Sequence, residues 1–490
     1  MTTAPREIAS DARAAARGTA TVLASRVAIA AMGWAGSVVV ARSLSADEWG
    51  QFSFVFVLLG LLSVVTDLGV GRVVLARLMD DDPDEVALTA SSFVALRTLL
   101  GVVGYVVAVA YVLILGYPSE VVRATAIAGL VVLFATPGNA LSVLFQSRHR
   151  LTYVAVAESL GQAVQLALTI LAAIFAPYLL VFVIPAIVNE LVALSWKSRG
   201  VHRKVLGVRP ARRIEVARWR EMLREALPLA IGFALTIALT KIDVLMLSLM
   251  DTFDAVGLYS IGYKFSDIMD TMALAVVAPV STLLVAAWPA RPEVFRRRSR
   301  DAGIAFGLMG AVAVASFWPS ANAVIELLYG ERFGQSTFAA QLLVVAAALT
   351  APVLLGLFLL ASAGHQRSYP LVAAGGLVLN IGLNLVLIPR YSFEGSAVAT
   401  VATMAAMVVA LWIVIARVVP IRGLLPVRAM LGLACVAAAV AATGQFVATH
   451  TPLPWPVVSA LAAALVLALA QPLRLTDGIR PWAILKARRG

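Results

Sequence analysis

Long, uninterrupted apolar segments constrain this chain more than any other feature. Hydrophobic residues make up 61% of its 490 residues and charged residues only 13%, whereas an ordinary soluble domain is about 25% charged. A water-soluble core cannot bury this much apolar sequence, so lipid must be the solvent for most of it, and helices then satisfy the backbone. The segments lack the period-two alternation of a membrane barrel. The sequence therefore predicts an all-α polytopic membrane protein.

The apolar segments also predict how the chain is organised. A membrane-spanning helix needs about 20 apolar residues, and the spans are expected at about 20–41, 51–71, 90–115, 122–145, 152–176, 178–196, 226–249, 257–288, 302–328, 338–363, 369–389, 394–416, 427–448 and 454–471. These fourteen spans predict an N-terminal six-helix lobe (1–196) and a basic cytoplasmic linker (197–225). A C-terminal six-helix lobe (226–420) and two extra helices with a basic tail (421–490) follow.

The placement of basic residues predicts the orientation. With the N-terminus inside, the inner loops hold 31 of the 39 Lys and Arg residues, the outer loops 4 and the spans 4. Because basic loops stay on the cytoplasmic side, both termini are expected in the cytoplasm and the protein in the inner (cytoplasmic) membrane of a bacterial cell. The net charge of +12 follows from this asymmetry, so the lipid bilayer and not nucleic acid is the expected partner.

Several kinds of chemistry find no support in the sequence. The one cysteine, Cys435, excludes an intrachain disulfide, and the four scattered histidines form no metal-ligand pattern. No stretch between spans exceeds about 30 residues, which leaves no room for a soluble catalytic domain. The phosphate-binding pattern GxxxxGK[ST] is absent, so ATP is not expected to drive the protein directly. We expect no cofactor, no metal and no enzymatic reaction.

Residues 375–400 are the most informative stretch. An apolar helix that carries Asn380 and Asn384 runs into Ile388-Pro389-Arg390, and after a short polar turn a second apolar helix is expected from Gly395. An internal repeat supports duplicated halves, as in many transporters. The starts of spans two and eight, 45–53 and 252–260, align in four positions.

These features, with a series of motifs, resemble the polysaccharide-transporter (oligosaccharide flippase) branch of the multidrug/oligosaccharidyl-lipid/polysaccharide exporter superfamily over about residues 20–420. The two C-terminal spans are similar to those of lipid II flippase relatives. Besides 375–400, the motifs are Ala41-Arg42-Ser43-Leu44-Ser45, Gly50-Gln51-Phe52, Asp67-Leu68-Gly69, Asp243-Val244-Leu245-Met246-Leu247, Val256-Gly257-Leu258-Tyr259-Ser260 and Leu328-Tyr329-Gly330-Glu331-Arg332-Phe333. The resemblance implies two lobes around a central polar cavity, alternating access and a polyprenyl-(pyro)phosphate-linked glycan as cargo.

Ionisable groups inside spans are costly and are therefore the first candidates for function. The basic ones, with one tyrosine, are the expected substrate-binding residues because they could hold an anionic headgroup: Arg26, Arg97, Lys241, Lys264 and Tyr263. The expected coupling or gating carboxylates are Asp67, Glu158, Asp243, Asp267 and Asp270. At 100° per residue, the span-eight members of both groups share one polar stripe of the helix.

The structural alternatives are specific. Arg26 stands as a lone guanidinium that either grips phosphate or reaches the inner surface. Asp67 either gates the cavity with Arg97 or Arg72 or forms a plain structural pair, and Lys264 and Asp267 form either a cavity surface or a structural pair.

The sequence thus favours a flippase for a polyprenyl-linked oligosaccharide or polysaccharide precursor, working beside the glycosyltransferases and polymerase of a glycan assembly pathway. A cation-coupled multidrug antiporter of the same superfamily is the first alternative, because intramembrane carboxylates would suffice for it. A membrane glycan polymerase or ligase is the second, although such enzymes usually need a large outer loop.

Overall fold

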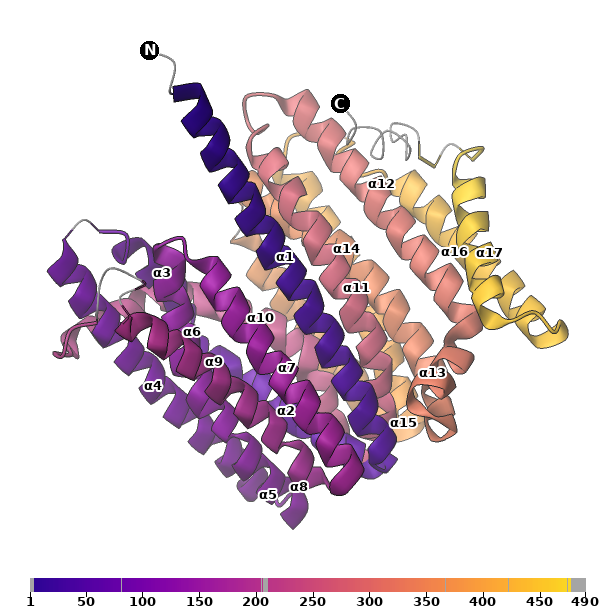
Figure 1. Cartoon of the computed structure of the whole chain (residues 1–490). Coiled ribbons are helices and arrows are strands. Elements are labelled where there is room, and N and C mark those ends of the chain that lie inside the picture. The colour runs from indigo at the N-terminus through magenta and orange to yellow at the C-terminus, as the bar shows by residue number, and fades with distance from the viewer. Residues whose placement is uncertain are drawn as a thin grey trace. The chain divides into compact units, whose positions relative to one another are not determined.

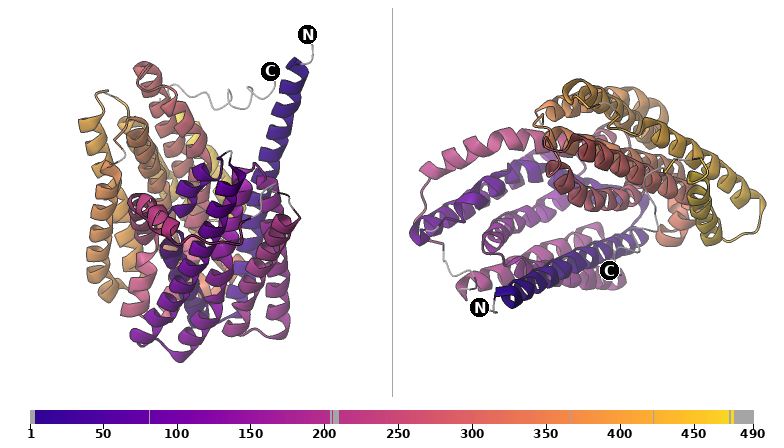
Figure 2. Two further views of the ribbon diagram at one scale, coloured as in Figure 1. Left: turned by 90° about the vertical axis from the view of Figure 1, so that its left-hand side faces the viewer. Right: turned by 90° about the horizontal axis from the view of Figure 1, so that it is seen from above.

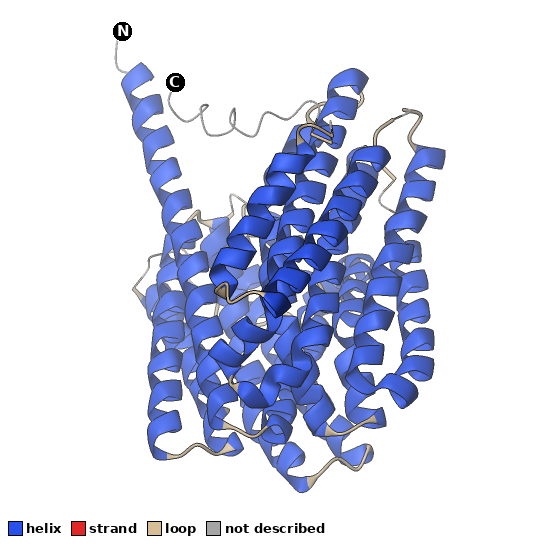
Figure 3. Ribbon diagram, turned by 90° about the vertical axis from the view of Figure 1, so that its right-hand side faces the viewer, coloured by secondary structure: helices blue, strands red, loops and turns tan. Residues whose placement is uncertain are grey.

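The computed structural model describes residues 4–80, 82–203, 205, 210–365, 367–421, 423–473 and 475–476. The regular structure of these residues is helical throughout, with no strand (Figure 3). Helix occupies most of every predicted span, and nine helical stretches among the described residues are long and apolar enough to cross a membrane. One of the nine, Ser368–Val418, contains two predicted spans. The predicted all-α polytopic fold is confirmed.

Packing divides the chain into two compact units, with the division between Lys241 and Ile242 (Figure 1). Unit 1 contains α1 (Ala4–Ser43), α2 (Ala46–Asp67), α3 (Val70–Arg77), α4 (Pro83–Ile114), α5 (Ser119–Ala128), α6 (Leu130–Ser147), α7 (Leu151–Phe175), α8 (Leu179–Phe182), α9 (Ile184–His202) and the first part of α10 (Ala217–Met250). The segmentation predicted from the spans stays a prediction about domain organisation.

In the hydrophobic core of unit 1, several helices pack together near one of their ends. Phe93 of α4 and Phe145 of α6 are fully buried there, and Met222 and Ala226 of α10 are buried in the same cluster. The first turns of α10 therefore pack as part of unit 1. Elsewhere in this unit α1 runs beside α7, and its first turns project past the other helices (Figure 2).

The start of α4 accounts for the acidic residues at 82–85. The side chain of Asp82 caps the helix by accepting hydrogen bonds from the backbone N–H groups of Asp84 (3.0 Å) and Glu85 (3.5 Å). Pro83 occupies the first helical position, where its missing N–H costs nothing. Acidic side chains in the first turn also interact favourably with the helix dipole, so this stretch fixes where α4 begins.

Among the described residues, unit 2 contains the rest of α10, seven further α-helices and two 3-10 turns. They are α11 (Phe253–Val285), α12 (Pro292–Phe317), η1 (Trp318–Ser320), α13 (Ala321–Tyr329), η2 (Glu331–Ser336), α14 (Thr337–Ser362), α15 (Ser368–Val418), α16 (Val427–His450) and α17 (Trp455–Ala470). Helix α14 packs against both α11 and α15. The two extra C-terminal helices, α16 and α17, pack on α12 through small and branched side chains such as Ala311, Leu433 and Val466.

The short turn predicted after Arg390 is confirmed. Helical geometry in α15 is interrupted at Ser392, with φ 52° and ψ −139°, and the chain reverses there, because Asn380 on one side of the interruption hydrogen-bonds to Thr403 on the other. A non-glycine residue rarely adopts such a positive φ. The Ser392 hydroxyl donates a hydrogen bond of 2.5 Å to Asp251 Oδ2, which helps to hold the chain in this conformation. The two predicted helices therefore lie side by side and are joined at Ser392.

The orientation predicted from the basic residues can be tested directly. Reporter enzymes fused after Arg203 and after Asp251 are expected to report opposite sides of the membrane, cytoplasmic for the first and external for the second. The reason is the concentration of Lys and Arg in alternate loops. Alkaline phosphatase and green fluorescent protein fusions would measure this, and the same side for both positions would contradict the fourteen-span layout.

Candidate functional site

An ion pair joins the end of α2 to the middle of α4 in unit 1. Arg97 Nη1 lies 2.5 Å from Asp67 Oδ1 and donates a second hydrogen bond of 2.7 Å to the carbonyl of Thr66. The arginine side chain is 4% exposed and the aspartate side chain 61%. Of the two partners considered for Asp67, the structure pairs it with Arg97. The burial of the two charges is unequal, so Asp67 carries most of the pair's contact with solvent.

A polar cavity of about 350 Å³ adjoins this pair. It exists because the chain turns sharply between α2 and α3, where Leu68 (φ 45°) and Gly69 (φ 66°) both have left-handed backbone conformations. Such turns favour glycine, which explains the Asp67-Leu68-Gly69 motif. Besides the ion pair, the polar lining comes from Ser63, Thr66, Arg72 and Asn139. The cavity thus combines guanidinium, amide and hydroxyl groups inside a membrane-spanning unit.

The walls of the cavity come from three helices that are distant in sequence. Phe93 of α4, Val143 of α6, and Ala230 and Ile237 of α10 all contribute apolar surface. The sequence predicts a pair of Asp67 with Arg97 or Arg72. It does not predict that α10 lines the same cavity.

A second ionic cluster joins α1, α7 and α9. Arg26 Nη1 lies 3.2 Å from Glu158 Oε2, and Lys197 Nζ lies 3.6 Å from Glu158 Oε1. The side chain of Lys197 is 3% exposed and that of Arg26 64%. The prediction that Arg26 is a lone guanidinium is therefore wrong, because Glu158 reaches it from α7.

Lys197 is the residue of this cluster that sequence reasoning missed. It was counted with the basic linker, but α9 continues past it to His202. A usable signal was present, since Glu190 and Lys197 are seven residues apart and so lie on the same face of a helix. A buried lysine with carboxylates nearby is costly unless it is paired, which is why Glu158 accompanies it.

Unit 2 contains a buried carboxylate, Asp243, which is 1% exposed. The hydroxyls of Tyr259 and Tyr263 donate hydrogen bonds of 2.5 Å and 2.6 Å to its Oδ2, and Thr400 Oγ1 lies 3.4 Å from the same oxygen. The backbone N–H of Val244 donates to Oδ1 at 2.9 Å. A carboxylate surrounded by hydroxyls inside a membrane can hold a proton or a small cation.

Two predicted site residues thus meet in this cluster in a way that the sequence did not indicate. Tyr263, expected to contact substrate, directs its hydroxyl to Asp243, expected to act in coupling. The two asparagines of the 375–400 stretch are also buried. Asn384 Nδ2 donates to Asn380 Oδ1 (3.0 Å), and Asn380 Nδ2 donates to Thr403 Oγ1 (3.4 Å). Asparagine side chains inside a membrane often join helices by hydrogen bonds, and these contacts connect the two sides of the kink in α15.

The charged side chains of the polar stripe predicted on α11 differ in their exposure. Asp267 is exposed, and Lys264 and Asp270 are half-buried. On the opposite face, Phe265 and Met269 are buried while Ile268 and Met272 are 43% and 53% exposed. The apolar side of α11 is therefore partly buried and partly exposed. In lipid an apolar side chain gains little from burial against protein, so hydropathy does not predict which apolar face packs.

The remaining predicted cation, Lys241, is half-buried near the end of unit 1. Among the described residues, no group of three or more His, Cys, Asp or Glu side chains could hold a metal ion. The structure therefore brings the predicted residues together in three pairs: Asp67 with Arg97, Arg26 with Glu158, and Tyr263 with Asp243.

Comparison with solved structures identifies the same architecture elsewhere. A structure of the lipid II flippase MurJ in an inward closed conformation is 13% identical, covers 94% of this chain and 99% of that chain, and has a TM-score of 0.75. An inward-facing multidrug resistance MATE family transporter is 15% identical, covers 79% and 94% of the two chains, and has a TM-score of 0.64. A transporter of the MOP superfamily from Pyrococcus furiosus is 15% identical, covers 82% of this chain and 95% of that chain, and has a TM-score of 0.60. At these identities the likeness shows the fold alone.

Sequence comparison assigns the family. No curated protein matches the chain significantly. The profile of the polysaccharide biosynthesis protein family matches residues 15–284, more than half of the chain. The chain therefore belongs to the polysaccharide biosynthesis protein family.

Proposed function

We propose that this transporter is a flippase that moves a polyprenyl-(pyro)phosphate-linked oligosaccharide or polysaccharide precursor across the bacterial cytoplasmic membrane by alternating access. The observation that carries the proposal is the polar cavity of unit 1, where Arg72 and Arg97 line a space within membrane-spanning helices. A pyrophosphate cannot enter hydrocarbon without compensating charge. Cations in such a cavity are what a carrier of that cargo needs.

Arg26 supports the same proposal from the second ionic cluster. Its side chain is 64% exposed although it is paired with Glu158, so part of the guanidinium is free to reach water. A guanidinium can bind two phosphate oxygens at once. Glu158 also balances the buried Lys197, so a phosphate that displaces Glu158 from Arg26 would leave that carboxylate with a partner.

We propose that Asp243 of unit 2 couples transport to a proton or cation. We also propose that Lys241 of unit 1 and Lys264, Asp267 and Asp270 of unit 2 face the cargo's path. The hydroxyls around Asp243 support the coupling role, because they can reorient as the carboxylate gains or loses a cation. Such coupling would draw on an ion gradient or on the membrane potential.

A cation-coupled multidrug antiporter is the second candidate, and the Asp243 cluster is the observation that favours it. A buried carboxylate that accepts hydrogen bonds from two tyrosine hydroxyls suits a cationic drug or ion. The membrane glycan polymerase or ligase has no comparable support, since the family and the similar folds are those of transporters. Glycosyltransferases and a polymerase remain proposed partners of the flippase.

A coupling variant separates these roles. Asp243→Asn keeps the size of the side chain and an oxygen acceptor for Tyr259 or Tyr263, but it removes the charge that holds a cation. Gradient-driven transport is expected to fall by about tenfold or more, as for loss of one charged hydrogen-bonding group, while exchange without a gradient continues. Transport by purified protein in vesicles with and without an imposed ion gradient would measure this. Equal loss in both modes would make Asp243 structural.

A further inference from the structure

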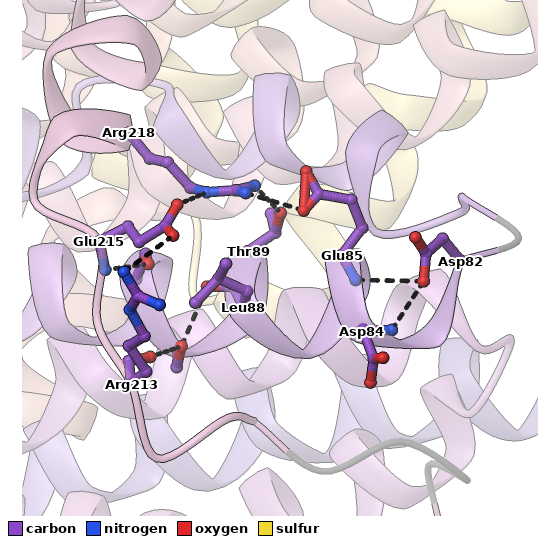
Figure 4. A network of polar contacts seen from close by, with 10 residues as sticks. Asp82, Asp84, Glu85, Leu88, Thr89, Arg213, Glu215 and Arg218 are labelled. Carbon is purple, nitrogen blue, oxygen red and sulfur yellow. Dashed lines mark hydrogen bonds and ion pairs between the residues drawn. The ribbon is translucent and has the colours of Figure 1, made fainter.

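The stretch before α10 and the first turn of α10 are bound to the start of α4 (Figure 4). Arg218 uses its whole guanidinium fork for this. Its Nη2 donates to Glu85 (2.7 Å), its Nη1 to Thr89 Oγ1 (3.1 Å) and its Nε to Glu215 (2.7 Å). The side chain is only 20% exposed. A planar guanidinium held at three positions fixes orientation as well as distance.

Further hydrogen bonds run beside the arginine. Ser91 Oγ donates to the carbonyl of Arg213 (2.7 Å), and the N–H of Glu215 donates to Ser92 Oγ (3.0 Å). The indole N–H of Trp219 donates to the carbonyl of Ser92 (2.8 Å). Both the backbone of the linker and the first turn of α10 are therefore attached to α4.

The end of α3 supplies a third attachment. Arg77 Nη2 lies 3.0 Å from Glu221 Oε1 and 2.7 Å from Glu225 Oε1. The hydrogen bond from Arg77 lowers the pKa of Glu221, and that from Arg218 lowers the pKa of Glu215. Both carboxylates are therefore ionised at neutral pH, and the attachments persist there.

The attached helix is also a wall of the polar cavity. Ala230 and Ile237 of α10 line it together with Phe93 of α4. Arg218 precedes Ala230 by twelve residues, which is about 18 Å along a helix. Because a helix transmits displacement as a rod over that length, the position of its first turn determines how closely this wall covers the cavity.

We infer that residues 211–225 form a clamp that holds α10 over the polar cavity of unit 1, and that Arg218 is its main positioning residue. These residues belong to unit 1 and are attached to both α3 and α4. The clamp acts on access to the cavity that the proposed function assigns to the anionic part of the cargo. It does so through Ala230 and Ile237 and without touching the cargo itself.

Cysteine labelling in the full-length protein tests the clamp without any transport assay. Asn139 lines the cavity and is exposed, so Asn139→Cys is placed in a Cys435→Ser background, because Cys435 is itself exposed. The rate of reaction with a negatively charged methanethiosulfonate is compared with and without Arg218→Gln. Loss of the charged hydrogen bonds is expected to raise the rate about tenfold. Trp219→Phe, which removes one hydrogen bond and keeps most of the ring, is expected to raise it less.

Two controls give every outcome a meaning. Arg296→Gln removes an equal charge from an exposed pair with Glu293 on α12, and it should leave the labelling rate of Asn139→Cys unchanged. The second control labels Ser119→Cys, whose rate Arg218→Gln should not change. Unchanged labelling of Asn139→Cys in both Arg218→Gln and Trp219→Phe would overturn the clamp. So would an equal increase in Arg296→Gln, because charge alone would then explain it. Since labelling needs no cargo, a failed clamp and a failed flippase assignment give different results.

Discussion

Asp67→Asn is expected to destabilise unit 1 by about 2–3 kcal/mol, because it leaves the guanidinium of Arg97 buried without a counter-charge. Removal of one partner from a fully buried pair costs about 3–5 kcal/mol, and the smaller figure allows for the 61% exposure of Asp67. An arginine cannot escape the penalty by losing its proton. Thermal unfolding of the purified protein in detergent, followed by tryptophan fluorescence, would measure the loss.

The opposite substitution should cost much less, and this asymmetry is the sharper test. Arg97→Met fills most of the buried volume with an apolar side chain and leaves only Asp67, which can remain in water. We expect Arg97→Met to unfold close to the wild type, and the double variant Asp67→Asn with Arg97→Met to be more stable than Asp67→Asn alone. If Arg97→Met proves the more destabilising single change, the unequal burial described for this pair does not govern its energetics.

Arg26→Ala is expected to slow flipping by about 10- to 100-fold, the range for losing a charge-assisted two-pronged grip. Arg26→Lys should restore only part of the rate, because an ammonium group cannot bind two phosphate oxygens in a plane. Since the Arg26 side chain is 64% exposed, its removal should leave thermal stability nearly unchanged. Transport rate and unfolding temperature measured on the same preparations would separate the two effects.

A matched control is Arg123→Ala, which removes an exposed arginine whose Nε donates to the carbonyl of Ser119. It should flip at the wild-type rate. A further comparison is Glu158→Gln, which leaves Lys197 without its closest carboxylate and should lower stability more than Arg26→Ala does. If Arg26→Ala lowers stability as much as Glu158→Gln and transport falls only in proportion, Arg26 is structural.

The class of fold could be predicted from sequence because lipid imposes simple rules. Apolar runs long enough to cross the bilayer must be helices, and each of the fourteen predicted segments is mainly helix. The family could be predicted from ordered motifs such as Asp67-Leu68-Gly69, where a left-handed backbone at Gly69 explains the residue type. Helix periodicity also placed Asn380 and Asn384 on one face, where they hydrogen-bond.

The partners within the sites could not be predicted in the same way. Periodicity gives the face of a helix but not the helix that it meets, so the contact of Arg26 with Glu158 was missed. Lys197 was assigned to a loop because a charged helix end looks like a linker in sequence. The meeting of Tyr263 with Asp243 depends on a crossing of α10 and α11. In lipid, such crossings follow from local packing and hydrogen bonds rather than from hydropathy.

The most direct test of the proposed function is transbilayer movement of a polyprenyl-pyrophosphate-linked oligosaccharide in vesicles that contain only the purified protein. The account predicts that wild-type protein moves the lipid, that protein-free vesicles do not, and that Arg26→Ala and Lys264→Ala each slow the movement by at least about tenfold. A result in which wild-type protein leaves the lipid in its original leaflet, while it exchanges a cationic drug for protons or sodium, would contradict the flippase and favour the antiporter.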